Sequence, residues 1–155
     1  MSVFKSQFSR ALTVIPSEYC DIPYPNAIVS SITESASPNR LYDEQVNFIA
    51  LNVGVGDIVY NNTSNLGATV LEVESQYGLV LNADIASSAG DSYTIYQASA
   101  QTGLGNQGCC LLAMDNDNVS IVTIGGDNVT IYIQKGNILP LQVKKITYGN
   151  VIALW

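Results

Sequence analysis

A glycine pattern near residue 105 is the most familiar motif in this chain. Gly103, Gly105 and Gly108 match the G-x-G-x-x-G spacing with which a strand-to-helix turn holds a dinucleotide. The residues that follow, Cys-Cys-Leu-Leu-Ala-Met and then a turn, do not read as the required helix. We therefore interpret residues 99–108 as a linker rich in small residues.

Two pairs of carboxylates have spacings that could hold a cation or transfer a proton. Asp115 and Asp117 begin like a calcium-binding loop, but the glycine and distal glutamate of an EF-hand are missing. A turn is the favoured interpretation, and a weak surface cation site stays open. Glu72 and Glu74 fall on one face of a predicted strand, where a solvated face is a simpler explanation than an acid/base pair.

The chain has three cysteines, Cys20, Cys109 and Cys110, and no histidine. An odd number with an adjacent pair is a poor disulfide framework, and a zinc site normally needs four ligands. A cysteine nucleophile needs a base, and no base is evident. Serine–lysine or paired-carboxylate chemistry is not excluded, but no spacing indicates it. We therefore predict no catalytic residue, no cofactor, no metal site and no enzymatic activity.

Composition limits the class of partner. Of the 155 residues, 47% are hydrophobic and 12% are charged, with a net charge of -7. This balance argues against nucleic acid, which needs clustered basic residues, and suits the outside of a large particle. No window approaches the roughly 18 apolar residues of a membrane span, and residues 1–16 lack the apolar core of a secretion signal. We expect neither nucleic acid nor membrane as a partner.

The last third of the chain has the clearest structural pattern. Apolar residues alternate with polar or smaller ones over 119–123, 129–133 and 139–143, so each run can coat one face of a sheet. Residues 125–128 and 135–137 contain the glycines that tight hairpins need between these runs. The apolar end, 151–155, is expected to be a packed strand or a subunit contact.

Alternation in the third of these runs predicts a specific face. Leu139, Leu141 and Val143 are expected to point to the same side of the sheet.

The rest of the chain also indicates strands. Residues 27–32 form a plausible strand, and short strands with turns between them over 41–98 suggest a small barrel or folded sheet. Residues 1–26 resemble an arm, with prolines breaking regular structure from residue 16 onward. No apolar pattern has a helical period with caps at both ends.

These patterns predict an all-β protein with a small β-barrel or sandwich base, an inserted second β lobe and an extended N-terminal arm. Residues 1–34 would hold the arm and the first strand of the base, and 106–155 its C-terminal part. Residues 35–105 would be the inserted lobe and linker. The reason for this division is that 27–32 has no local partner, whereas 109–114 could pair with it.

Three stretches resemble parts of tailed-phage virion proteins. The segment GGDNVTIYIQKGNILPLQVKKITYGNVIALW, 125–155, resembles the carboxyl end of spike-base or head-decoration proteins, and ALTVIPSEYCDIPYPNAIVSSI, 11–32, resembles their opening. The order GDIVYN, TVLEV, L-L and G-SYTIY over 56–96 resembles a β module of phage structural proteins.

This resemblance implies a capsid decoration or cement protein that bridges neighbouring major capsid protein subunits on the outside of the head. It would be made in the bacterial cytoplasm and act as a homo-oligomer, with a homotrimer expected. A tail, neck or spike-base component is the alternative in the same class. A carbohydrate-binding module, suggested by nine tyrosines, is the alternative in another class.

Candidate contact residues lie at both ends of the chain. In the arm they are Phe4, Phe8, Leu12 and Ile15, and at the carboxyl end they are Leu154 and Trp155. The arm either packs on its own domain or crosses a neighbouring subunit, and the sequence leaves both possibilities open.

Overall fold

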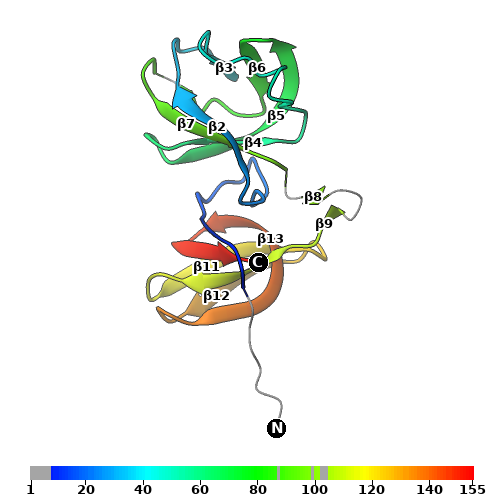
Figure 1. Cartoon of the computed structure of the whole chain (residues 1–155). Helices are drawn as coiled ribbons and strands as arrows, with labels where there is room; N and C mark the ends of the chain where they lie inside the picture. The colour runs from blue at the N-terminus through cyan, green and yellow to red at the C-terminus, as the bar shows by residue number, and fades with distance from the viewer. Residues whose placement is uncertain (1–7, 87, 99, 102–104) are drawn as a thin grey trace.

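The computed structural model describes residues 8–86, 88–98, 100–101 and 105–155. Within these ranges the chain is all-β, without a helix, and it forms two six-stranded antiparallel sheets and a two-stranded ribbon. The two sheets lie one above the other in Figure 1. The predicted all-β class is therefore confirmed.

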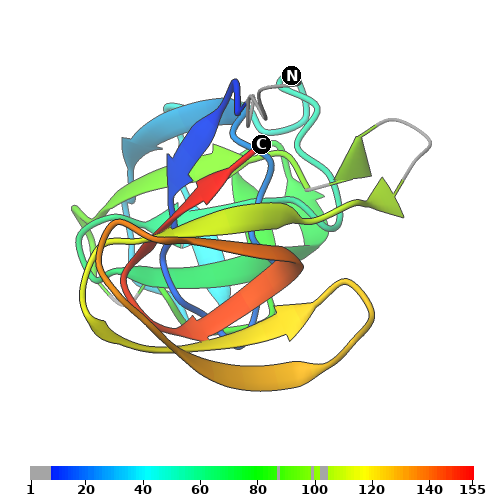
Figure 2. The same ribbon diagram turned by 90° about the horizontal axis from the view of Figure 1, so that it is seen from below.

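The lower sheet in Figure 1 is called the C-terminal sheet, and its strand order is β1-β14-β10-β13-β11-β12. Its strands are β1 (Ala11–Thr13), β10 (Cys109–Ala113), β11 (Asp117–Thr123), β12 (Asn128–Ile133), β13 (Ile138–Tyr148) and β14 (Val151–Leu154). Figure 2 shows β1 running beside β14, so the first and the last strand of the described chain pair in one sheet.

The upper sheet is called the middle sheet, and its strand order is β2-β7-β4-β5-β6-β3. Its strands are β2 (Ala27–Ile32), β3 (Arg40–Tyr42), β4 (Ile58–Asn61), β5 (Leu66–Ser75), β6 (Gly78–Leu81) and β7 (Ser92–Tyr96). An isolated bridge between Ser35 and Tyr42 also brings the chain just after β2 beside the edge strand β3.

Each sheet has a core of its own. In the C-terminal sheet, Leu111, Val143 and Ala153 are fully buried, and in the middle sheet Phe48 and Ile95 are fully buried. Along β10 and β14 the buried side chains come from alternate positions, as a sheet with one covered face requires.

The predicted hairpins are confirmed. Gly126 has a φ of 92° between β11 and β12, and Gly136 has a φ of 85° between β12 and β13. Residues with a Cβ rarely adopt these angles, which explains the glycines at both positions. The apolar carboxyl end is strand β14, which pairs with β1 on one side and β10 on the other.

The prediction that Leu139, Leu141 and Val143 share one face is wrong for Leu141. Val143 is buried, whereas Leu141 is 37% exposed. Between Cys109 and Leu111 the register of β10 against β13 shifts, so that β13 has additional residues there. A bulge of this kind interrupts the alternation of side chains, which redirects Leu141 outward.

The expected pairing of 27–32 with 109–114 is also wrong. Strand β2 pairs with β7, and the hydroxyls of Ser30 and Thr94 lie 2.9 Å apart across that pair. Strand β10 has no edge left for it, because β13 and β14 occupy both sides. The chain therefore passes from β1 to the middle sheet before returning to β10.

Residues 99–108, predicted to be a linker, include a short ribbon. Strand β8 (Ala100–Gln101) pairs with β9 (Gly105–Asn106), and the ribbon projects beside the C-terminal sheet in Figure 1. Gly103 of the glycine pattern lies outside the described residues.

Candidate functional site

Residues 14–22, called the wedge segment, lie between the two sheets. The amides of Ser17 and Ile22 donate hydrogen bonds to carbonyls of β13, of 2.9 and 2.7 Å. The Ser17 hydroxyl donates a 2.8 Å bond to the carbonyl of Gly67 in β5. One short segment is thus bonded to both sheets.

A small apolar cluster surrounds the wedge segment. Cys20, Ile58 and Tyr60 are buried there, with Leu12 and Ile15 packed against them. Burial raises the pKa of the Cys20 thiol to about 11. A thiol that remains protonated is a poor nucleophile, so the geometry gives Cys20 a packing role.

The wedge segment holds the backbone of Tyr19 at the rim of the middle sheet. The Tyr19 carbonyl accepts hydrogen bonds from the Thr69 hydroxyl, at 2.8 Å, and from the Asn82 amide nitrogen, at 2.7 Å. The Tyr19 amide donates to the Ser17 hydroxyl at 3.0 Å. The Tyr19 side chain nevertheless stays 48% exposed. Its backbone is therefore fixed while its ring is presented to solvent.

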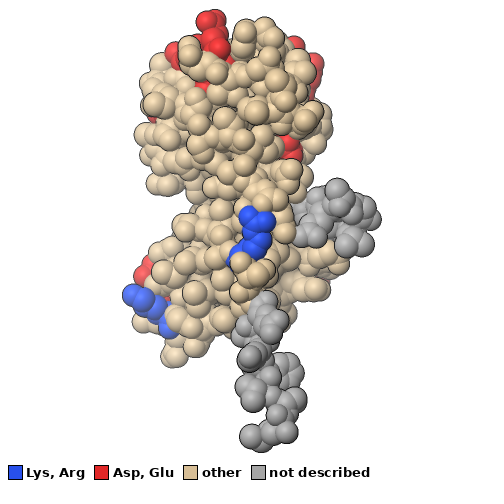
Figure 3. All heavy atoms as spheres, in the orientation of Figure 1, with Lys and Arg blue, Asp and Glu red and all other residues tan. Residues whose placement is uncertain are grey.

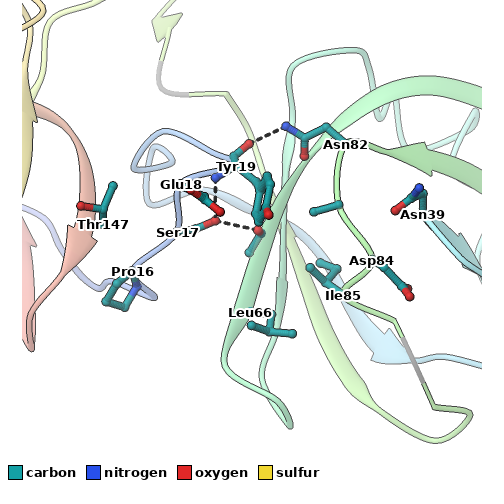
Figure 4. Close-up of a pocket in the computed structure, with 12 residues that line it drawn as sticks. Pro16, Ser17, Glu18, Tyr19, Asn39, Leu66, Asn82, Asp84, Ile85 and Thr147 are labelled. Carbon is teal, nitrogen blue, oxygen red and sulfur yellow. Dashed lines mark hydrogen bonds between the residues drawn. The ribbon is translucent and has the colours of Figure 1, made fainter.

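Tyr19 lies in a cleft of about 760 Å³ between the sheets. Figure 4 shows the lining residues, which come from the wedge segment, from strands and loops of the middle sheet and from β13. They are Pro16, Ser17, Glu18, Tyr19, Asn39, Leu66, Gly67, Asn82, Ala83, Asp84, Ile85 and Thr147. These described lining residues include two carboxylates and no basic side chain.

A second recess of about 310 Å³ adjoins the cleft, because Pro16 and Thr147 line both. Its other lining residues are Asp117, Tyr148, Gly149 and Asn150. The Tyr148 hydroxyl donates a 3.1 Å hydrogen bond to Asp117, and the Tyr148 side chain is exposed. The cleft and the recess thus share two lining residues, and each has an exposed tyrosine in its lining.

The outer face of the C-terminal sheet is apolar over three neighbouring strands. Leu112 of β10 is paired with Ile138 of β13 and with Ile152 of β14, and Cys110 is paired with Leu154. The residues next to them in β10 and β14 are buried, so these side chains point away from the core. We call Cys110, Leu112, Ile138, Ile152 and Leu154 the outer apolar patch.

Charge is divided unevenly between the two halves of the molecule. Residues 26–98, which hold the middle sheet, contain eight carboxylates and one basic residue, Arg40. Residues 8–25 and 105–155 contain five carboxylates and four basic residues. Figure 3 shows acidic but no basic side chains on the upper half of one face, and both basic and acidic side chains on the lower half. Nearly all of the net negative charge thus belongs to the middle sheet.

The predicted contact residues are distributed over several environments. Phe8 is exposed, whereas Leu12 and Ile15 pack into the cluster at the wedge segment. Leu154 belongs to the outer apolar patch. Phe4 lies outside the described residues.

Trp155 is held within its own chain. Its ring meets that of Tyr24 edge-on, with centroids 6.1 Å apart, and its backbone bonds to Ser9 and Arg10.

The carboxylates noted in the sequence bond to protein donors. Asp115 accepts a 2.7 Å hydrogen bond from Asn150, and Asp117 accepts bonds from Tyr148 and from the Asn118 amide. Glu74 accepts a 2.9 Å bond from Tyr42. Among the residues described, no group of three His, Cys, Asp or Glu side chains could hold a metal ion.

Sequence reasoning missed the cleft. Its members Tyr19, Leu66 and Asp84 are far apart in the chain, and only the packing of the wedge segment brings them together. The sole local signal was the polar step Pro16-Ser17-Glu18 before an aromatic residue.

No protein-family model, curated protein or solved structure matches this chain. Over the described ranges, no helix has the length and hydrophobicity needed to cross a membrane.

Proposed function

We propose that this protein is a structural component of a tailed-phage virion that attaches to the outside of the head and bridges neighbouring subunits of the major capsid protein. The outer apolar patch is the observation that carries the proposal. Five uncharged apolar side chains from three adjacent strands face away from the core, on the half of the molecule with little net charge. Ile138 is exposed and the other four residues are half-buried, and apolar side chains left partly open to solvent on one face favour a protein partner.

The uneven charge supports an orientation on the particle. The C-terminal sheet, being nearly neutral, would lie against the shell, and the acidic middle sheet would point outward. An acidic outer surface repels nucleic acid and other acidic particles, which keeps virions apart. In this arrangement the two sheets have separate roles.

The free energy available from the patch favours attachment through several copies of the protein. Covering one part-exposed Leu or Ile gains roughly 1 kcal/mol, whereas association costs an estimated 4–15 kcal/mol. A patch of five side chains therefore binds weakly alone. An oligomer that presents several patches to adjacent capsid subunits binds far more tightly, because later contacts form within the same complex.

Strand β12 offers a surface for self-association. In the described part of the chain it pairs with β11 alone, and its sequence Asn-Val-Thr-Ile-Tyr-Ile contains neither a charge nor a proline. Natural proteins usually protect such an edge. Pairing of β12 with β1 of the next copy would be heterologous, and heterologous contacts can close into a ring such as the proposed trimer.

A direct test is an electron-microscopy map of virions that contain the protein. The proposal expects density for it on the outer surface of the head, between major capsid protein subunits, with the C-terminal sheet innermost. Density at the tail or neck would support the alternative within the same class. Absence of the protein from purified virions would overturn the proposal.

A carbohydrate-binding module is the second candidate function. The observation that favours it is the exposed ring of Tyr19, held by its backbone in a cleft with polar and apolar walls.

A further inference from the structure

We infer that the cleft beside Tyr19 is a binding site for a neutral oligosaccharide. This inference rests on the second candidate function and names its ligand class. It is independent of attachment to a capsid, because the cleft lies between the sheets whereas the outer apolar patch lies on the outer face of the C-terminal sheet. A protein bound through the patch could still offer the cleft to a sugar.

The ring of Tyr19 is pre-organised for a ligand. Its backbone nitrogen and oxygen make three hydrogen bonds to side chains, so the main chain that carries the ring is already fixed and only side-chain rotation is lost on binding. Ser17 supports this arrangement with both functions of its hydroxyl, which donates to Gly67 and accepts from Tyr19.

Gly67 allows the wedge segment to approach this closely. A Cβ at this position would lie 3.0 Å from the Cys20 sulfur and 3.2 Å from the Tyr60 ring. The position of Tyr19 therefore depends on a glycine in the facing strand.

The chemistry of the lining suits a pyranose ring. Such a sugar has an apolar C–H face, which can pack on the Tyr19 ring and on the exposed side chain of Leu66, and hydroxyls around its edge. Glu18 and Asp84, both exposed, supply carboxylate oxygens, which are strong acceptors for hydroxyl donors. Thr147 adds a hydroxyl from the opposite sheet.

Asn82 has a positioning role. Its side-chain oxygen accepts a 2.9 Å bond from the Thr69 amide, and its nitrogen donates to the Tyr19 carbonyl. The bond from Thr69 fixes the orientation of the side-chain amide, and its nitrogen holds Tyr19.

The charge of the cleft lining and the volume of the cleft distinguish between classes of ligand. The described lining has two carboxylates and no Lys or Arg, which disfavours an anionic ligand. A volume of about 760 Å³ is too large for a single small cation and falls within the range of about 300–1,000 Å³ that organic ligands occupy. The adjoining recess with Tyr148 supplies room for further sugar rings, so an oligosaccharide should bind more tightly than a disaccharide.

The test is a titration of the isotopically labelled protein, followed by amide chemical shifts. The probes are cellohexaose, maltohexaose, laminarihexaose and mannohexaose at millimolar concentration, with the disaccharide of any that binds. The inference expects at least one hexaose to shift amides at residues 18–19, 66–67 and 82–85, and to bind better than its disaccharide.

Variants separate a specific site from non-specific contact. Tyr19→Ala keeps the three backbone hydrogen bonds, so the fold should be preserved, and it should weaken binding about tenfold or more, equivalent to ~1.4 kcal/mol. Tyr77→Ala, which removes another exposed tyrosine of the middle sheet, should leave the affinity unchanged.

Three results would overturn the inference. They are the absence of localised shifts with all four hexaoses, equal affinity of Tyr19→Ala and the unmodified protein, and shifts at the same amides with spermidine or calcium but with no sugar. The last result would assign the cleft to a cation.

Discussion

The hydroxyl of Tyr93 donates a 2.7 Å hydrogen bond to a carboxylate oxygen of Asp43, and neither residue is more than 1% exposed. Asp43 also accepts a bond from the amide of Gln45, at 2.9 Å. Burial and the neighbouring carboxylate raise the pKa of Tyr93 well above its ordinary value. The core of the middle sheet therefore contains a buried carboxylate, Asp43, whose burial is compensated by hydrogen bonds from Tyr93 and Gln45.

Removing this hydroxyl should destabilise the protein. Tyr93→Phe leaves the buried Asp43 carboxylate with one donor fewer, and we expect a loss of about 1–3 kcal/mol in the free energy of unfolding. Tyr42→Phe is a matched control, because its hydroxyl also bonds to a carboxylate, Glu74, but at the surface. The control should change stability by less than ~0.5 kcal/mol. Urea denaturation measures both, and equal effects would contradict this account of Asp43.

Gly67 should not tolerate a methyl group. Gly67→Ala places a Cβ against the Cys20 sulfur and the Tyr60 ring, and overpacking of this kind costs about 1–3 kcal/mol. Gly54→Ala is the control, since nothing lies within 4 Å of a Cβ there. Thermal unfolding should show a lower midpoint for the first variant and no decrease for the second. A Gly67→Ala protein as stable as its parent would mean that the wedge segment packs more loosely than described.

Alkaline pH should weaken the fold through the buried thiols. Burial raises the pKa of Cys20 to about 11 and that of Cys109 to about 12, from ordinary values of 9.0. The unfolded chain therefore loses these protons first, and the free energy of unfolding should fall as pH rises from 9.0 toward the folded values. Below this range the thiols stay protonated in both states and should make no pH-dependent difference.

Denaturation curves between about pH 8 and 10.5 give the measurement, because this range spans the thiol pKa of an unfolded chain. Cys20→Ala should flatten the fall in stability at the alkaline end, whereas Cys110→Ala, at a half-buried position, is the control. If Cys20→Ala leaves the slope unchanged, ionisation of this thiol is not linked to unfolding.

Charges on the free edge should prevent self-association. Thr130→Lys with Tyr132→Lys places two cations on the exposed side of β12, and charged edge strands resist pairing. Sedimentation velocity should show a trimer for the parent and a monomer for this double variant. Ser64→Lys, in an exposed loop, should leave the oligomer intact. A double variant that stays trimeric would place the self-contact elsewhere.

The sequence predicted those features that depend on neighbours in the chain. Alternation placed strands at β11 and β12, and glycines predicted the turns at Gly126 and Gly136. It did not predict that β2 pairs with β7, because several strands of similar composition compete for each edge. The outward turn of Leu141 depends on a register shift that alternation does not record.

The candidate surfaces were harder to predict for the same reason. Leu154 was expected to be a contact residue, but three of its neighbours in the outer apolar patch belong to β10 and β13 and could not be found without the strand register. Tyr19 and Asp84 share a cleft only because Asn82 and Thr69 hold the wedge segment. The local alternation of apolar and polar residues carries no information about such contacts between distant parts of the chain.

The central claim is that the C-terminal sheet binds the capsid through the outer apolar patch, and two matched variants test it most directly. Ile138→Glu changes a patch residue that is 42% exposed, and Ile49→Glu changes a residue that is 58% exposed in the loop between β3 and β4. Both positions are accessible enough to accept a charge without disturbing a core. The measurement is the amount of each variant that co-sediments with heads assembled without the protein. We expect Ile138→Glu to be lost and Ile49→Glu to be retained at the parent level; retention of Ile138→Glu, or equal loss of both, would contradict the claim.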